Sequence, residues 1–277
     1  MTDKMTVPGV VSRKGGRKLS MLTAYDAVLA RLADASGVDM ILVGDSLAMV
    51  GLGQPDTLAV GMDAMVHHTR AVSRGTERAL VVGDMPFMSY QTCDEEAVRN
   101  AGRFLAEGRA GAIKLEGGAR MLSRVRAIVA ADIPVMGHIG LTPQSVAKLG
   151  GFKVQGKTAK AGRALVDEAR LLEEAGCFSL VLEAVPAPIA QLITEAVSIP
   201  TIGIGAGPHC DGQVLVTHDV LGLFDRFTPR FVKRYAELGR AAVAAMEDFR
   251  KEVEEGTFPA EEHCFDMPAA EIEKLKD

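Results

Sequence analysis

The chain of 277 residues has little cysteine, and none of it is spaced as a CxxC pair; the four residues are Cys93, Cys177, Cys210 and Cys264. So few scattered cysteines argue against a disulfide framework, and a structural zinc site lacks its ligand spacing. His67 and His68 are adjacent, so on a helix their side chains point about 100° apart and cannot chelate a metal as an i, i+4 pair does. Reduced, scattered thiols suit the cytoplasm.

The chain also lacks a basic excess and long apolar runs. It carries 31 Lys and Arg against 36 Asp and Glu, a formal net charge of −5, whereas a nucleic-acid surface requires clustered basic residues. No apolar run approaches the ~18 residues of a membrane span, and residues 1–10 lack the apolar core of a signal peptide. We therefore expect no nucleic-acid partner, no membrane partner and a cytoplasmic location.

Short apolar runs alternate with longer amphipathic runs along the chain. The short runs predict eight strands, at 19–24, 40–44, 80–84, 112–116, 135–139, 179–183, 201–204 and 214–216. Helical patterns between them include 26–36, 94–107, 159–175 and 188–197. Each strand run is too short and too apolar for a half-exposed antiparallel strand, and strands separated by helices indicate a parallel sheet. Eight strands favour a closed (β/α)8 barrel over an open sheet.

The length agrees with one such barrel, because barrels of this kind commonly form one domain of about 250 residues. We therefore expect residues 1–277 to form a single (β/α)8-barrel domain of the α/β class. A long helix over 232–255 is expected to close the fold. A polar C-terminal tail is expected from about residue 261.

Polar residues stand at the ends of the predicted strands; they are Tyr25 and Asp26, Asp45 and Ser46, Asp84, Lys114 and Glu116, His138, and Glu183. In a βα barrel the carboxyl ends of the strands meet at one rim, where the chemistry takes place. Each acid taken alone could simply cap the next helix, as we expect of Asp26 and Asp94. Four acids, a lysine and a histidine at five strand ends indicate a binding or catalytic site instead.

Three of the acids form a candidate metal site. Asp45, Asp84 and Glu116 are hard oxygen ligands, which select Mg²⁺ or Mn²⁺ rather than Zn²⁺. We expect Asp45 and Asp84 to bind the metal directly and Glu116 to act through water. A metal with two free cis positions chelates a 2-oxo acid and stabilises the enolate formed when the neighbouring carbon loses a proton.

The remaining polar residues suggest roles around such a substrate. Lys114 can hold the substrate carboxylate, with Ser46 as a second hydrogen-bond donor. A Schiff-base role for Lys114 is the alternative, but Glu116, two residues along the same strand, would keep the lysine charged and unreactive. Glu183 lies two strands further round the barrel and is the candidate base, with apolar neighbours expected to raise its pKa above about 4.3.

The glycine-rich run 203–207 allows three interpretations. It lacks the third glycine of a dinucleotide-binding fingerprint at the required spacing. Loops after the seventh strand of a barrel often bind phosphate. We favour a tight turn that lets two backbone segments approach closely.

Six stretches of the sequence resemble the ketopantoate (3-methyl-2-oxobutanoate) hydroxymethyltransferase family; they are 21–26, 44–47, 83–87, 114–118, 137–144 and 203–207. The resemblance runs in order from about residue 19 to residue 265. It implies a (β/α)8 TIM barrel of the phosphoenolpyruvate/pyruvate class, one Mg²⁺ per subunit and a homodecamer. The implied reaction belongs to pantothenate biosynthesis: a hydroxymethyl group passes from 5,10-methylenetetrahydrofolate to 3-methyl-2-oxobutanoate, via a metal-stabilised enolate, to give 2-dehydropantoate.

The resemblance also implies roles for individual residues. Asp45 and Asp84 match metal ligands, and Glu116 matches a third metal-associated acid. The substrate contacts implied are Asp45, Ser46, Asp84, Lys114 and His138, with His138 near the transferred group. Glu183 matches the proton acceptor.

Two other functions remain open. A carbon–carbon lyase on the same kind of barrel would share the metal and the oxo acid, but would not depend on folate. A non-catalytic sensor of an oxo acid would not need a base such as Glu183.

Overall fold

Eight parallel strands close into a barrel in the order of the sequence, from β1 to β8. The computed structural model describes residues 4–275. The strands are β1 Leu19–Thr23, β2 Met40–Val43, β3 Leu80–Asp84, β4 Ala112–Glu116, β5 Val135–Gly140, β6 Ser179–Glu183, β7 Thr201–Ile204 and β8 Gly212–Leu215. The predicted (β/α)8 barrel is therefore confirmed. Only β8 is displaced, starting two residues before the predicted strand, because Gly212 pairs with Leu19 of β1.

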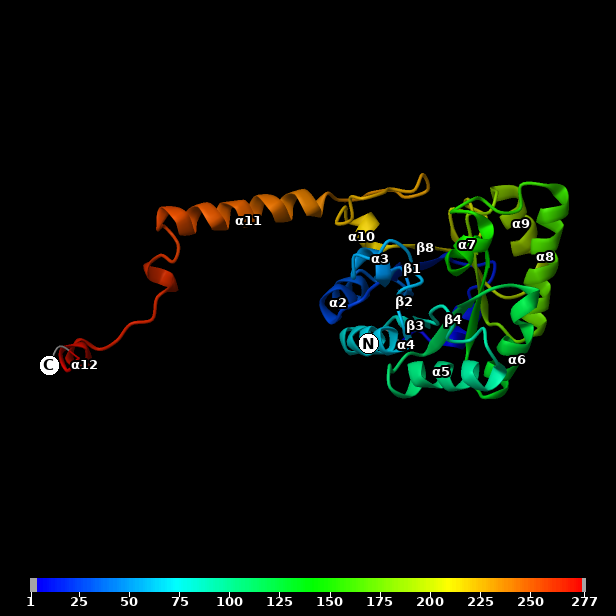
Figure 1. The fold of residues 1–277 in the computed structure, drawn as a ribbon, viewed down its shortest axis with the longest axis horizontal. Helices are drawn as coiled ribbons and strands as arrows, with labels where there is room; N and C mark the ends of the chain where they lie inside the picture. The colour runs from blue at the N-terminus through cyan, green and yellow to red at the C-terminus, as the bar shows by residue number, and fades with distance from the viewer. Residues whose placement is uncertain (1–3, 276–277) are drawn as a thin grey trace.

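Helices follow most of the strands and pack outside the barrel (Figure 1). They are α2 Ala27–Ala35, α3 Leu47–Val50, α4 Met62–Gly75, α5 Asp94–Ala106, η1 Ala119–Met121, α6 Leu122–Ala130, η2 Pro143–Ser145, α7 Val146–Leu149, α8 Ala159–Glu174, α9 Ala187–Ala196 and α10 Thr217–Val220. Asp26 caps α2 as predicted, accepting from the N–H groups of Val28 and Leu29. β7 runs directly to β8 through the loop 205–211.

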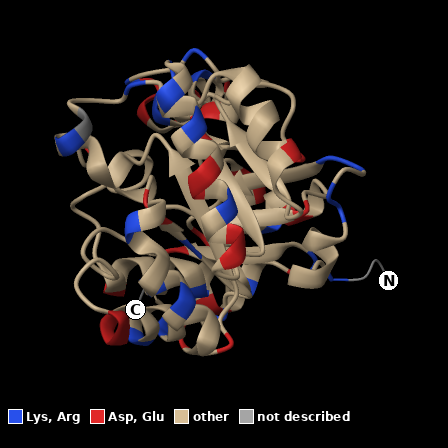
Figure 2. Cartoon of the chain, turned by 90° about the vertical axis from the view of Figure 1, so that its right-hand side faces the viewer, with Lys and Arg blue, Asp and Glu red and all other residues tan. Residues whose placement is uncertain are grey.

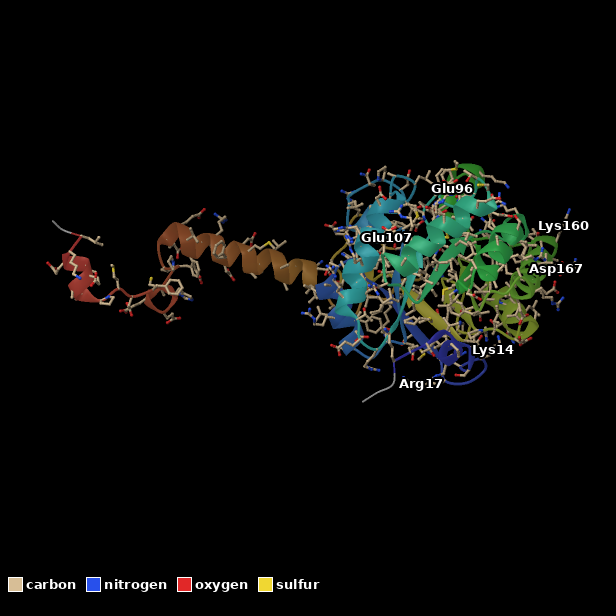
Figure 3. All side chains as sticks on the ribbon, turned by 90° about the horizontal axis from the view of Figure 1, so that it is seen from below. Lys14, Arg17, Glu96, Glu107, Lys160 and Asp167 are labelled. Atoms are coloured by element: carbon tan, nitrogen blue, oxygen red, sulfur yellow. The ribbon has the colours of Figure 1, made fainter. Side chains whose placement is uncertain are left out.

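The interior of the barrel is apolar except at its carboxyl end. Leu19, Met21, Met40, Leu80 and Val82 are among the inward side chains that form one buried cluster. A short helix that the sequence analysis missed, α1 Val7–Val11, adds the fully buried Val10 to this cluster. The chain then continues through Lys14 and Arg17, which lie at the opposite end of the barrel from Glu96 in Figure 3. The amino-terminal end of the barrel is therefore closed, and the predicted site is reached from the rim formed by the carboxyl ends of the strands.

The last long helix, α11 Leu238–Glu255, does not close the fold as predicted. It starts six residues later than expected and has no buried residue, and in Figure 1 it extends away from the barrel. Backbone hydrogen bonds fix its direction, because the N–H groups of Tyr235, Leu238 and Gly239 donate to the carbonyls of residues 220–222. Two short helices, η3 Glu261–His263 and α12 Ala269–Glu273, follow it.

Positive and negative residues are mixed over the face shown in Figure 2 and form no stripe of one sign there. None of the described helices combines the length and the apolar character that a bilayer span requires.

Candidate active site

The predicted site residues lie at the carboxyl ends of neighbouring strands, because the strand register places them there. Lys114 is level with Asp84 on the adjacent strand, and His138 is level with Glu116. Glu183 at the end of β6 pairs with Gly140 of β5. The side chains continue the inward rows of β3, β4, β5 and β6 above the apolar interior. The acids Asp45, Asp84 and Glu116 are buried, as are Lys114 and His138.

Asp84 and Lys114 form a buried ion pair. Asp84 Oδ1 lies 2.7 Å from Lys114 Nζ, and Asp84 Oδ2 accepts the backbone N–H of Asp45 at 3.1 Å. Burial raises the pKa of Asp84, and the neighbouring ammonium opposes that rise. Burial alone would lower the pKa of Lys114, but the surrounding carboxylates outweigh it and raise the pKa. Lys114 is therefore a cation, as the sequence analysis expected.

His138 lies between Lys114 and Glu183, although its Nε2 makes no aligned hydrogen bond to a described residue. Its Nδ1 lies 3.2 Å from Lys114 Nζ, and its Nε2 lies 3.2 Å from Glu183 Oε2. Burial and then the lysine charge lower the pKa of His138 well below its ordinary value, so the ring is neutral. An ammonium has only donors, so Nδ1 must accept. The ring proton is then on Nε2, on the side of Glu183.

Glu183 has the properties expected of a base. Burial raises its pKa to about 7, against an opposing effect of Lys114, which confirms the predicted direction of the shift. Its side chain is still 17% exposed, more than that of His138 at 3%. A carboxyl group with a pKa near neutrality is partly ionised at neutral pH, and its ionised form is a useful proton acceptor.

Gln144 holds two of the acids in place, and the sequence analysis gave it no role. Its side-chain Nε2 donates to Asp45 Oδ2 at 3.0 Å and to the Met85 carbonyl at 2.9 Å. Its backbone N–H donates to Glu116 Oε2 at 3.0 Å, and its Oε1 lies 2.8 Å from the Tyr90 hydroxyl. Gln144 lies in η2, shortly after the end of β5, and this position could have indicated a role in the site. Tyr90 lies six residues beyond β3, and its position gave no such indication.

Ser46 lies at the same rim but its hydroxyl bonds to Tyr25, at 2.7 Å between Oγ and OH. The site therefore has two parts: a buried charged cluster and a hydroxyl pair beside it. Neither part lies in the two surface hollows, of about 520 and 390 Å³, which are lined largely by residues of α4 and α5.

The donor set fits a divalent cation. Asp45, Asp84 and Glu116 are buried around a single ammonium, and burying unbalanced charge is costly. Asp84 Oδ1 is buried and, although close to Lys114, has no aligned hydrogen-bond donor. Among the described residues, no group of three or more His, Cys, Asp or Glu side chains is arranged to hold a metal ion. One or two of these carboxylates, together with water and substrate, would be the ligands of a hard divalent cation.

The glycine-rich run forms the tight turn that we favoured. Gly205 and Gly207 have positive φ values of 64° and 77°. A Cβ on Gly207 would lie 2.4 Å from the Cβ of Ala187, and one on Gly205 would lie 2.7 Å from the ring of Phe231. The positive φ values and the close packing against Ala187 and Phe231 explain these two glycines.

Solved structures with the same fold are proteins of several activities. A phosphonopyruvate hydrolase in complex with oxalate and Mg²⁺ superposes with a TM-score of 0.62 at 16% identity, covering 98% of this chain and 95% of that one. A 2,3-dimethylmalate lyase of the PEP mutase/isocitrate lyase superfamily gives 0.60 at 17% identity, covering 96% and 92%. At these identities the likeness concerns the fold alone.

Sequence comparison is more specific. The family model described as ketopantoate hydroxymethyltransferase matches residues 4–261. The 3-methyl-2-oxobutanoate hydroxymethyltransferase of Syntrophobacter fumaroxidans is 62% identical over 275 residues, covering 99% of this chain and 98% of the relative. That of Oleidesulfovibrio alaskensis is 60% identical, covering 100% and 96%. The chain therefore belongs to the ketopantoate hydroxymethyltransferase family.

Proposed function

We propose that this protein transfers a hydroxymethyl group from 5,10-methylenetetrahydrofolate to 3-methyl-2-oxobutanoate, giving 2-dehydropantoate. The observation that carries the proposal is the rim cluster: three buried carboxylates, one buried ammonium and a separate base with a raised pKa, in a chain of this family. Each part answers a need of the reaction, which must bind an anionic oxo acid and remove the proton from its C3.

Asp45 and Asp84 would hold Mg²⁺ directly, and Glu116 would act through water. When bound, the metal polarises the keto group and stabilises the negative charge that develops as C3 is deprotonated. Gln144 holds Asp45 and Glu116 in position by hydrogen-bonding to both. The cluster is thereby ordered before any ligand arrives, which is how an active site stabilises developing charge most effectively.

Lys114 would bind the substrate carboxylate as a charge, with Ser46 as a hydrogen-bond donor. A Schiff base requires a neutral amine, whereas the pKa of Lys114 is raised by Asp84 and Glu116 in spite of its burial. The ion pair with Asp84 also fixes the ammonium at the rim.

Glu183 would take the C3 proton. His138, as a neutral ring with its proton on Nε2, would lie beside the Glu183 carboxylate and the transferred carbon. The rival functions lose support here: a sensor needs no base of raised pKa, and a lyase of this fold is only 17% identical to this chain, far below the named hydroxymethyltransferases.

The test separates proton removal from carbon transfer. Enzyme, Mg²⁺ and 3-methyl-2-oxobutanoate in D₂O should exchange the C3 proton without folate, seen by proton NMR as collapse of the methyl doublet. Glu183→Gln is nearly isosteric and should slow exchange by about 10²–10⁴-fold, the usual effect of a positioned general base. Adding 5,10-methylenetetrahydrofolate to the unsubstituted enzyme should then give 2-dehydropantoate.

Three results would contradict parts of the proposal. Undiminished exchange in Glu183→Gln would show that another group is the base, and His138 is the nearest candidate. Absence of exchange even after adding tetrahydrofolate, which has no carbon to donate, would contradict the enolisation step. Exchange without hydroxymethyl transfer would favour the lyase alternative.

The homodecamer and the cytoplasmic location, implied by the resemblance and by the scattered thiols, stay predictions. Light scattering on the purified protein would measure the number of subunits.

A further inference from the structure

The larger of the two surface hollows lies between α4 and α5 and has a volume of about 520 Å³. Its lining comes from the second half of α4 and from the end of α5 with the residues that follow it: Arg70, Ser73, Arg74, Ala106, Glu107 and Arg109. Each of these helices runs back from the rim to the start of the next strand, so its end lies at the amino-terminal end of the barrel. We call this surface, on which Figure 3 labels Glu107, the arginine hollow.

The arginine hollow holds positive charge that its own residues do not neutralise. Its one carboxylate, Glu107, is bonded to Arg103, with 2.8 Å between Oε1 and Nε. That hydrogen bond is the main cause of the lowered pKa of Glu107, and the charge of Arg70 adds to it. In the part of the chain that the structure describes, Arg70, Arg74 and Arg109 form no hydrogen bond and no salt bridge of their own. Three guanidinium groups therefore line one hollow without an anion between them.

The fold holds these three charges at one place. Arg70 and Arg74 are four residues apart on α4, so their charges lie on the same side of the helix and repel each other. Ser73 donates its hydroxyl to the Gly108 carbonyl at 2.8 Å. That bond ties α4 to the segment after α5, from which Arg109 reaches the same hollow.

Arg109 contributes its charge at a cost to the backbone. Its φ is 61°, in the left-handed region that is unfavourable for a residue with a Cβ and that glycine or asparagine adopts more readily. Strained backbone of this kind persists where the surrounding structure holds it, often at ligand sites. Repelling charges and a strained residue thus meet at the arginine hollow, and a bound anion would offset the repulsion.

The lining of the hollow indicates the class of that anion. A guanidinium group presents a planar fork of N–H donors that matches two phosphate oxygens. A phosphate group also carries up to two negative charges, whereas a carboxylate carries one. The volume lies in the range of about 300–1,000 Å³ that small-molecule pockets have, so the hollow has room for more than a lone phosphate ion. None of the six lining residues is aromatic, so a nucleobase would have no ring to stack on.

We propose that the arginine hollow binds a small aliphatic molecule that carries a diphosphate group, with the phosphates between Arg70, Arg74 and Arg109. The hollow lies at the opposite end of the barrel from the rim cluster, so the inference is independent of the proposed reaction. The chain runs from Arg74 into β3 and from Arg109 into β4. A bound diphosphate would therefore contact the segments that lead into two strands of the rim cluster.

Calorimetry in the absence of Mg²⁺, which would itself bind diphosphate, tests the site. Isopentenyl diphosphate, an aliphatic diphosphate ester, should bind the unsubstituted protein at one site per chain. Arg70→Gln combined with Arg74→Gln should weaken binding about 100-fold, because both arginines lose charge-assisted hydrogen bonds to phosphate. The matched control Arg99→Gln removes a charge from the exposed surface of α5 outside the hollow and should leave the affinity unchanged. Circular dichroism checks that each variant is folded.

Three results would overturn the proposal. Absence of binding to the unsubstituted protein, or equal affinities in the double variant and the unsubstituted protein, would show that the hollow is not a diphosphate site. Equal affinity for glutarate, a dicarboxylate, would show that the hollow does not select phosphate. Tighter binding of inorganic pyrophosphate than of the ester would identify the free ion as the ligand.

A single substitution separates ligand binding from stability at Arg109. Arg109→Asn should weaken binding of isopentenyl diphosphate about tenfold. It should not lower the melting temperature, because asparagine adopts a positive φ more readily than arginine does. A lowered melting temperature with unchanged affinity would show that Arg109 serves the fold and does not contact the diphosphate.

Discussion

Asp84 has a charged partner on one side and a hydrogen-bond donor on the other, and each contact ties it to another member of the site. Lys114 lies 2.7 Å from one oxygen, and the Asp45 N–H donates to the other. We predict that Asp84→Asn weakens Mg²⁺ binding by more than the roughly 10–100-fold that loss of an outer-shell partner costs. Isothermal titration calorimetry with Mg²⁺ and the oxo acid measures this directly.

Asp34 supplies the matched control for that prediction. It is also a buried carboxylate, but it accepts the backbone N–H groups of Glu77 and Ala79 below the rim. Asp34→Asn should therefore lower the melting temperature and leave Mg²⁺ affinity unchanged. Equal Mg²⁺ affinities in Asp84→Asn and the unsubstituted enzyme would remove Asp84 from the metal ligands.

The raised pKa of Glu183 predicts a pH dependence with a definite sign. Because burial raises that pKa to about 7, the base form is lost as the pH falls through 7. We predict that the rate of C3 exchange declines below about pH 7, approaching tenfold per pH unit. Proton NMR of the exchange from pH 5 to 9 tests this, and the decline should be absent from the residual rate of Glu183→Gln.

The raised pKa of Glu183 also makes the stability of the fold depend on pH, but in the opposite direction from the rate. A carboxyl whose pKa is higher in the folded than in the unfolded state favours folding most below its unfolded value of 4.5, and this contribution is lost as the pH rises through 7. Relative to Glu183→Gln, the free energy of unfolding of the unsubstituted protein should therefore fall between pH 4.5 and 7, as measured by urea titration.

Individual residues also show which parts of the site the sequence could predict and which it could not. The strand-end acids, Lys114 and His138 were found because the barrel topology brings strand ends together whatever lies between them. Gln144 was missed because its role depends on a loop conformation that aims one amide at Asp45 and Met85. The pairing of Ser46 with Tyr25 depends in the same way on rotamers that no pattern encodes.

At the scale of elements, α2 and α4 cross closely at a glycine. A Cβ on Gly75 would lie 2.3 Å from the Ala27 carbonyl, whereas Gly102 in α5 has no atom within 4 Å of that position. We predict that Gly75→Ala lowers the free energy of unfolding by about 1–3 kcal/mol through overpacking. Gly102→Ala should raise it by roughly 0.5–1 kcal/mol, because alanine is the better helix former. Urea unfolding of both variants compares them, and equal effects would contradict this account.

The strands and most of the helices could be predicted because the spacing of their apolar residues matches the face that each element buries against the barrel. The apolar residues of α11 produced the same pattern and led to the wrong prediction that this helix closes the fold. A periodic pattern predicts an amphipathic helix, but it does not predict what the apolar face of that helix contacts. The start of α11 at Leu238 rather than Val232 follows from the backbone bonds to residues 220–222, which no pattern reveals.

At the scale of the whole molecule, the predicted homodecamer would couple folding to concentration. A tenfold rise in subunit concentration favours association by about 1.4 kcal/mol, and a partner that binds only the folded state raises the melting temperature. We predict that the unsubstituted protein melts a few degrees higher at tenfold higher concentration. Differential scanning calorimetry over that range of concentrations tests this, and a melting temperature independent of concentration would contradict it.

The distribution of the site residues over separate strand ends also has an evolutionary consequence. Each of them can change without altering the apolar interior that holds the barrel together. New reactions can therefore arise on this barrel by changes at the rim alone, while the fold stays the same.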